Sequence, residues 1–155
     1  MFEAKLKQLG IELPEAPKPL AAYIPAVKTG KYVYTSGQLP LKGGELKFKG
    51  KVGSDLTEAE GYEAAKLCAV NCLSVVKSAI GSLDAIKRIV KVTGFVNSAP
   101  GFQAQPKVVN GASEFLGEVF GDAGKHARAA VGVSELPLDA AVEIEMIVKL
   151  KDKAR

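Results

Sequence analysis

The stretch HARAAVGVSELPLDAAVEIEMIVKL, residues 126–150, decides the fold, because it predicts two β-strands joined by a connection, Ser134 to Ala141, that carries Pro137. Successive side chains of a strand point to opposite faces of its sheet. In the first strand, one face carries Ala129, Val131 and Val133, and the other face carries Arg128, Ala130 and Gly132. In the second strand, one face carries Val142, Ile144, Met146 and Val148, and the other face carries Glu143, Glu145 and Ile147.

Pairing the two strands with their apolar faces together brings Arg128, Glu143 and Glu145 to the other side of the sheet. A planar guanidinium binds a carboxylate through two parallel hydrogen bonds, and the gap left by Ala130 and Gly132 has room for a small acid. The pattern therefore predicts a site for a small carboxylate on this face. The alternative is that these charges form the solvated face of an edge hairpin, where ion pairs stabilise little.

The composition is that of a globular protein: 155 residues, of which 47% are hydrophobic and 25% charged, predict a single domain over residues 1–155. The net charge of +4 comes partly from the terminal KLKDKAR, and the other lysines are scattered without interleaved aromatic residues. We therefore expect no nucleic-acid partner. No apolar run has the pattern of a signal peptide or the length of a membrane span, so we expect a cytoplasmic protein without a membrane partner.

Cys68 and Cys72 lie four residues apart in a helical pattern, which places both thiols on one face among alanines and valines. Free cysteine is among the most buried residue types, so we expect reduced, buried thiols. A zinc site would need further ligands, and His126 is the only histidine. We therefore expect no metal.

The N-terminal part predicts a lead-in followed by a hairpin. The segment LPEAPKPL carries three prolines, which forbid a regular helix or a central strand, so residues 1–20 are expected to be an extended lead-in. Two β-rich runs then flank a turn that contains Gly30. The elements expected here are a short helix over residues 3–9, hairpin strands over 23–27 and 31–38, and a short strand near 46–48.

The centre of the chain predicts two amphipathic helices with a strand between them. Thr57 and Glu60 have the spacing of a capping box, and apolar residues then recur at helical spacing until Gly81. The run IKRIVKVTGFVN, residues 86–97, is dense in β-branched residues and predicts a strand. Residues 103–120 predict the second helix.

A polar lane opposes the apolar stripe of the second helix and consists of Asn110, Ser113 and Gly117. It lacks the long charged side chains that are usual on a solvated helix face. The lane either meets another chain or is a small exposed face, and the sequence leaves both interpretations open.

The order of elements predicts an α+β fold with one mixed sheet covered on one face by two helices. The other face is then bare, is expected to carry Arg128, and is a natural surface for self-association. Classical nucleophilic catalysis is not expected. Neither Ser36 nor Ser134 has an evident histidine partner, and no GxSxG or P-loop motif occurs.

Three motifs resemble the reactive intermediate deaminase (Rid, also called YjgF) family: TSGQLP at residues 35–40, the VVNGASEFL helix after SAPGF, and ARAAVGVSELPLDAAVEIE at residues 127–145. The resemblance runs from Tyr23 to Leu150 and is greatest to a longer subgroup with ARxAVGV and QPKVVNGASE. It implies a chorismate-mutase-like α+β fold and a homotrimer with three ligand sites between subunits. It also implies hydrolysis of 2-enamino or 2-imino acids to 2-oxo acids and ammonium.

By the same resemblance, Arg128 matches the carboxylate-binding arginine of the family, and Glu143 matches the acidic residue near the reacting carbon. The other matched pocket positions are Tyr23, Ser36, Gly37 and Asn110. The chain departs from the archetype in the AAYIPAV run and at Ala130, where the deaminases have a cysteine. The backbone amide at Ala130 survives this change, so we keep the residue in the expected pocket.

The implied chemistry needs no metal or organic cofactor. An imine carbon is already electrophilic, and it has only to be oriented by its carboxylate while protons move between water and nitrogen. Two other functions stay open. One is a non-catalytic trimer that binds or senses a small carboxylate such as a 2-oxo acid. The other is a ribonuclease or translation inhibitor, for which the chain lacks a paired histidine or a basic, aromatic groove.

Overall fold

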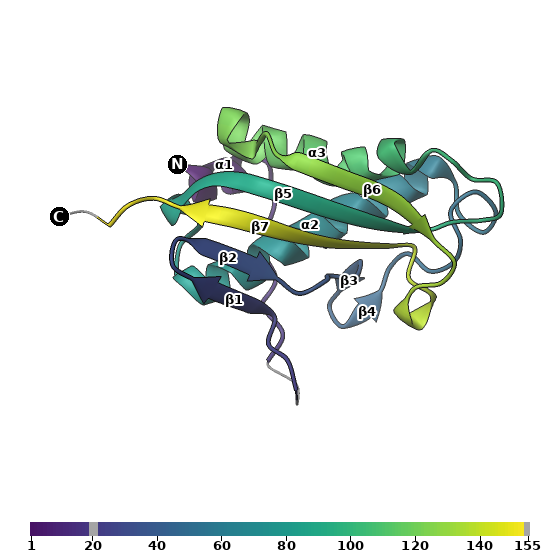
Figure 1. Ribbon diagram of the computed structural model, residues 1–155, viewed down its shortest axis with the longest axis horizontal. Coiled ribbons are helices and arrows are strands. Elements are labelled where there is room, and N and C mark those ends of the chain that lie inside the picture. Colours follow the sequence, from purple (N-terminus) through teal and green to yellow (C-terminus); the bar gives the residue numbers. More distant parts are fainter. Residues whose placement is uncertain (19–21, 154–155) are drawn as a thin grey trace.

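The computed structural model describes residues 1–18 and 22–153 and consists of a sheet with helices on one side (Figure 1). Residues 19 and 20 of the expected lead-in lie outside the described residues. The helices are α1 (Phe2–Gln8), α2 (Glu58–Ile80) and α3 (Gln105–Phe120). The strands are β1 (Ala26–Thr29), β2 (Tyr32–Thr35), β3 (Leu41–Lys42), β4 (Glu45–Leu46), β5 (Ile86–Asn97), β6 (Ala127–Val133) and β7 (Val142–Leu150).

The main sheet is mixed and has five strands in the order β1-β2-β7-β5-β6. β5 pairs antiparallel with β7 and parallel with β6, so α3 is the crossover that carries the chain from β5 to β6. The expected α+β fold, with two long helices on one face, is confirmed (Figure 1). The expected pairing of the two strands within residues 126–150 is wrong, because β5 lies between β6 and β7.

α2 and α3 cover the sheet with their apolar stripes. The predicted capping box begins α2: the Glu60 amide donates to the Thr57 hydroxyl, and the Thr57 amide donates to the Glu60 carboxylate. Cys68 and Cys72 lie on the buried face of α2 and are free thiols, as predicted. α3 crosses α2 closely at Gly111, where a Cβ would lie only 1.9 Å from a backbone carbonyl oxygen of α2.

The register of the strands decides which face Arg128 occupies. Arg128 is the Cα partner of Val92 on β5, and Val92 is the partner of Met146 on β7. Residues in one row of a sheet point to the same face, and both Val92 and Met146 are buried under the helices. Arg128 therefore lies on the helix-covered face, and the expectation that it stands on the bare face is wrong.

Glu143 and Glu145 lie on the face without helices, as predicted. They alternate along β7 with the buried residues Ile144 and Met146. The error concerned β6 alone. Its side chains are only partly buried on both faces, because it is an edge strand, so its sequence does not reveal which face the helices cover.

The remaining predicted elements differ from the structure in their bounds. The first hairpin is formed by β1 and β2 around a turn at Gly30, and the N-terminal helix begins one residue earlier than predicted. The short strand expected near residues 46–48 is replaced by the small β3–β4 hairpin. Within the described ranges, no helix is both long and apolar enough to cross a membrane.

Candidate functional site

The first group of candidate residues lies between β6 and α3 and is centred on Arg128. Its Nη1 donates to Asn110 Oδ1 at 2.8 Å and to Ser113 Oγ at 3.2 Å, one helical turn further along α3. All three side chains are half-buried. Among the described residues, Nη1 makes all the hydrogen bonds of this guanidinium, which leaves the Nε and Nη2 edge for another acceptor. That edge has the geometry for two parallel hydrogen bonds to a carboxylate.

The polar lane of α3 is therefore turned toward β6 of the same chain. Asn110 and Ser113 both use their oxygen atoms as acceptors for Arg128. The interpretation as an exposed face is wrong for these two residues, which are half-buried in their own subunit, and contact of the lane with another chain stays a prediction. The sequence could not pair the lane with β6, because the contact joins segments 15 to 18 residues apart through the loop after α3.

His126 belongs to the same group and was not among the predicted site residues. Its Nε2 lies 2.9 Å from Ser113 Oγ, and its Nδ1 lies 2.6 Å from the carbonyl oxygen of Gly124. Burial lowers the pKa of His126 below the ordinary 6.5, and the charge of Arg128 lowers it further. Its spacing was the available signal, since a residue two positions before Arg128 on extended chain points to the same side.

Small residues follow Arg128 along the same face of β6. Ala130 is half-buried and is the Cα partner of Gly94. A Cβ at Gly132 would lie 2.7 Å from Gln105 Nε2, so the lane of small residues ends against Gln105. Gln105 and Ser98 therefore occupy the space at Gly132 that the sequence predicted to be open.

Glu143 belongs to the second group, on the face without helices. β2 and β7 continue to pair across a bulge, because Gln38 lies four positions after Tyr34 while their partners Ile144 and Ile147 on β7 are three positions apart. This bulge contains Ser36 and Gly37. Such bulges often re-aim side chains next to functional sites.

Gly37 makes room for the carboxylate of Glu143. A Cβ at Gly37 would lie 2.4 Å from Glu143 Oε1, so a side chain at this position would displace that carboxylate. Burial raises the pKa of Glu143 above the ordinary 4.5, and repulsion by Glu145 raises it further. The Ser36 hydroxyl donates to the carbonyl oxygen of Ile24 at 2.7 Å, which ties the bulge to the segment before β1.

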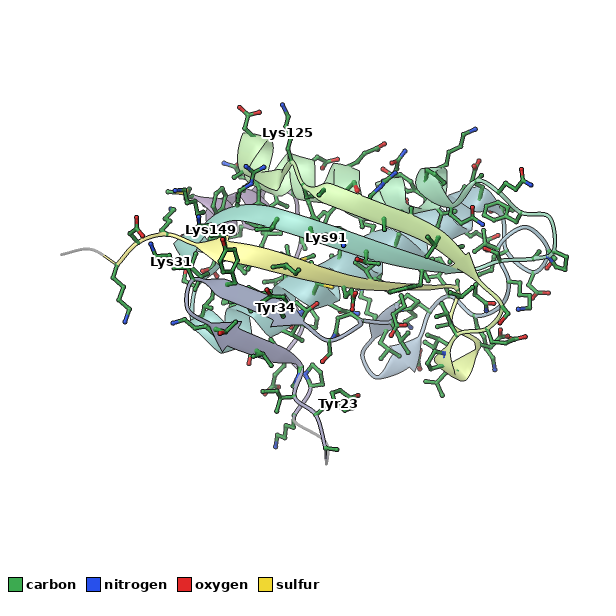
Figure 2. All side chains as sticks on the ribbon, viewed as in Figure 1. Tyr23, Lys31, Tyr34, Lys91, Lys125 and Lys149 are labelled. Carbon is green, nitrogen blue, oxygen red and sulfur yellow. The ribbon has the colours of Figure 1, made fainter. Side chains whose placement is uncertain are left out.

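The predicted site residues are therefore brought together in two groups, which the fold keeps apart. Arg128, Asn110 and Ala130 lie on or against the helix-covered side of β6, whereas Glu143 lies with the Ser36–Gly37 bulge on the other face. Tyr23 is 65% exposed and extends away from the sheet (Figure 2).

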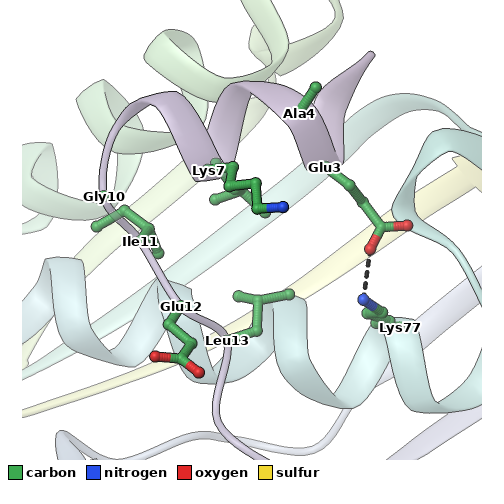
Figure 3. Close-up of a pocket in the computed structure, with 9 residues that line it drawn as sticks. Glu3, Ala4, Lys7, Gly10, Ile11, Glu12, Leu13 and Lys77 are labelled. Carbon is green, nitrogen blue, oxygen red and sulfur yellow. Dashed lines mark hydrogen bonds and ion pairs between the residues drawn. The ribbon is translucent and has the colours of Figure 1, made fainter.

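A hollow lies between α1, the lead-in and α2 (Figure 3). Glu3 and Lys77 form an ion pair across it, and the Ser82 hydroxyl donates to the second carboxylate oxygen of Glu3 at 2.5 Å. These bonds lower the pKa of Glu3, that of Lys77 being the stronger. These contacts anchor the N-terminal helix to α2 and to the turn that follows it.

Curated relatives match nearly the whole chain. Protein TCP17 of Trypanosoma cruzi is 45% identical over 150 residues, covering 96% of this chain and 94% of that protein. The 2-iminobutanoate/2-iminopropanoate deaminase of Dermatophagoides farinae is 31% identical over 141 residues, covering 91% of this chain and 95% of the relative.

Solved structures share the fold. Protein Atu1372 of Agrobacterium tumefaciens, of unknown function, superposes with a TM-score of 0.91 at 46% identity, covering 97% of this chain and 92% of its own. TdcF of E. coli with bound serine superposes with a TM-score of 0.64 at 27% identity, covering 88% of this chain and 94% of its own.

A family model settles the relationship. The model described as YjgF/chorismate mutase-like, which also carries the label endoribonuclease, matches residues 3–150. The match includes both groups of candidate residues, and the name of the Dermatophagoides farinae relative agrees with it. The chain therefore belongs to the YjgF family, also called the reactive intermediate deaminase (Rid) family.

Proposed function

We propose that this protein is a cytoplasmic deaminase that hydrolyses 2-imino and 2-enamino acids to 2-oxo acids and ammonium. The observation that carries the proposal is the guanidinium of Arg128, which Asn110 and Ser113 hold through Nη1 alone. Its Nε and Nη2 edge makes no hydrogen bond among the described residues and suits a carboxylate. The proposal seats the small acid beside Ala130, which follows Arg128 on the same face of β6.

Glu143 supplies the second half of the chemistry. Water adds to the imine carbon, its protons reach the nitrogen, and the resulting carbinolamine expels ammonia, which takes up a proton and leaves as ammonium. Arg128 orients the substrate by its carboxylate. Glu143, with a raised pKa in a partly buried setting, moves protons between the water and the nitrogen.

The proposal places each site between two copies of the chain in a homotrimer. Arg128 and Glu143 point to opposite faces of one sheet, so no single copy presents both to one small ligand. The face without helices also exposes an apolar surface, to which Tyr34, Val27 and Val131 contribute with exposed fractions of 45%, 48% and 44%. Tyr34 stands on this face in Figure 2. A second copy that covers such a surface removes it from water.

Two relatives support the choice of substrate class. One is a 2-iminobutanoate/2-iminopropanoate deaminase, and the other is TdcF, which binds serine. Serine and these imino acids are small acids with nitrogen on the carbon next to the carboxylate. Arg128 is suited to the carboxylate that these ligands share.

The test couples the protein to a dehydratase that releases 2-aminoacrylate and follows pyruvate formation. We expect pyruvate to form faster than by spontaneous hydrolysis, and we expect Arg128→Ala to remove the acceleration. Lys107→Ala is the matched control, because it removes an exposed charge from α3 that takes no part in the hydrogen bonds of Arg128. No acceleration with imines derived from several amino acids would overturn the proposal.

A non-catalytic trimer that binds 2-oxo acids is the second candidate. It is favoured by Ala130, which stands where the deaminase archetype has a cysteine. Binding of pyruvate or 2-oxobutyrate without any acceleration of imine hydrolysis would establish this function in place of the first.

A further inference from the structure

We infer that Ser113 and His126 are positioning residues for Arg128, joined to it in a hydrogen-bond chain that runs in one direction. The inference rests on the proposed role of Arg128 as the carboxylate-binding residue. It adds to that role the reason why the guanidinium presents its Nε and Nη2 edge. It concerns Arg128, Ser113, His126 and the backbone of Gly124, which together we call the positioning chain.

The direction of the positioning chain follows from its two ends. The Gly124 carbonyl can only accept, so His126 must carry its proton on Nδ1, which lies 2.6 Å away. The guanidinium can only donate, so Ser113 Oγ, 3.2 Å from Arg128 Nη1, must accept from it. The hydroxyl proton of Ser113 then has one destination, the free lone pair of His126 Nε2 at 2.9 Å.

The elements that carry these residues explain why they meet. Ser113 lies three residues after Asn110 on α3, so both oxygens face the same strand. His126 lies one residue before β6 begins, and the short helical turn at residues 121–124 brings the Gly124 carbonyl to its ring. The guanidinium thus donates from Nη1 to two acceptors, Asn110 Oδ1 and Ser113 Oγ, and these two hydrogen bonds hold it.

A serine next to a histidine also resembles a nucleophilic pair, and two contacts argue against that role. The lone pair that would attack a substrate already accepts a hydrogen bond from Arg128. The ring nitrogen that a carboxylate would support in a catalytic triad donates instead to a backbone carbonyl. The adjacent charge of Arg128 further disfavours the imidazolium that such catalysis requires.

The positioning chain should fail when His126 gains a second proton. Nε2 then becomes a donor, Ser113 must accept from it, and two cations compete for one hydroxyl oxygen. The groups around the ring are Arg128 from β6, the neutral Ser113 from α3 and the Gly124 carbonyl. The neighbouring Lys125 lies 3.2 Å from Asp122 in an ion pair of its own. No carboxylate among these contacts would stabilise the protonated ring.

The first test measures pyruvate affinity by titration calorimetry between pH 7 and pH 5. We expect the wild type to lose about tenfold in affinity over this range, the effect of weakening one hydrogen bond to a charged group. His126→Gln keeps an acceptor but cannot titrate, so the fall in affinity that comes from the imidazole should be absent. Ser113→Ala should bind about tenfold more weakly at pH 7 and lose the pH dependence.

Burial, and then repulsion by Glu145, raises the pKa of Glu143 above the ordinary 4.5, and its effect on affinity has the opposite sign. Protonation of Glu143 removes a negative charge and should strengthen the binding of an anion. Repeating the titration in the Glu143→Gln background isolates His126. A wild-type affinity that does not fall toward pH 5 in this background, or His126→Gln that follows the same profile as its parent, would overturn the inference.

The second test needs no ligand and therefore separates this inference from the proposed function. The chain has one histidine, so its ring nitrogens give one set of ¹⁵N resonances. We expect the Nδ1-protonated tautomer at pH 7, with an Nε2 resonance that shifts in Ser113→Ala. An Nε2-protonated ring, or covalent labelling of Ser113 by a fluorophosphonate, would overturn the positioning role. Absence of pyruvate binding at every pH, with the expected tautomer present, would instead count against the proposed function of Arg128.

Discussion

Arg128 and Glu143 point to opposite faces of the same sheet, with β5 between the strands that carry them. Arg128 shares its row with the buried Val92, and Glu143 shares its row with Phe95 on the other face. Two strand spacings separate β6 from β7, a lateral distance of about 10 Å. A small acid cannot contact both side chains in one copy of the chain. The proposed chemistry therefore requires a second copy.

The first prediction concerns assembly. We expect light scattering at micromolar concentration to give about three times the chain mass of 16.3 kDa. Tyr34→Glu places a charge on the exposed apolar surface and should shift the mass toward that of one chain. A wild-type monomer at this concentration would contradict the account.

The second prediction concerns ligand binding. Arg128→Ala should weaken binding of 2-oxo acids by about 1.5–3 kcal/mol, the contribution of hydrogen bonds to a charged group. Assembly should persist, because Arg128 lies at the edge of the sheet and is only half-buried. Calorimetry with pyruvate and 2-oxobutyrate measures the change, and unchanged affinity would remove Arg128 from the site.

The third prediction concerns turnover. Glu143→Gln should lower imine hydrolysis by a factor on the order of 10²–10⁴ while 2-oxo acid affinity stays the same or improves. Burial, and then repulsion by Glu145, raises the pKa of Glu143 above the ordinary 4.5. The wild type should therefore lose activity as the pH falls through this raised pKa, because the carboxylate becomes protonated. The variant should lack this acid limb. Equal activity in both proteins would make Glu143 a structural residue.

The fourth prediction concerns Gly37. A methyl group there would lie 2.4 Å from Glu143 Oε1, and the flexible carboxylate is the part that would move. Gly37→Ala should therefore reduce turnover with little effect on urea unfolding. Gly117→Ala is the control, because its added Cβ would meet nothing within 4 Å beyond its chain neighbours and the backbone of its own helix. A loss of stability in Gly37→Ala that matches its loss of turnover would refute this interpretation.

Local sequence predicted the elements well and their partners less well. The strand at residues 86–97 and the capping box of α2 were correct, since β-branched density and capping are local signals. The partner of β6 was not, because the sequence of an edge strand with little burial on either face specifies no pairing. The same limit hid the contact of Ser113 with His126, which depends on how α3 returns to the sheet.

The most direct measurement of the central claim mixes two inactive variants. Arg128→Ala and Glu143→Gln are each unfolded and refolded together in equal amounts, and native mass spectrometry verifies mixed trimers. If each site takes Arg128 from one chain and Glu143 from the next, about one site in four regains both residues, and hydrolysis should return to about a quarter of the wild-type rate. Mixed trimers that stay as inactive as either parent would contradict a site shared between chains.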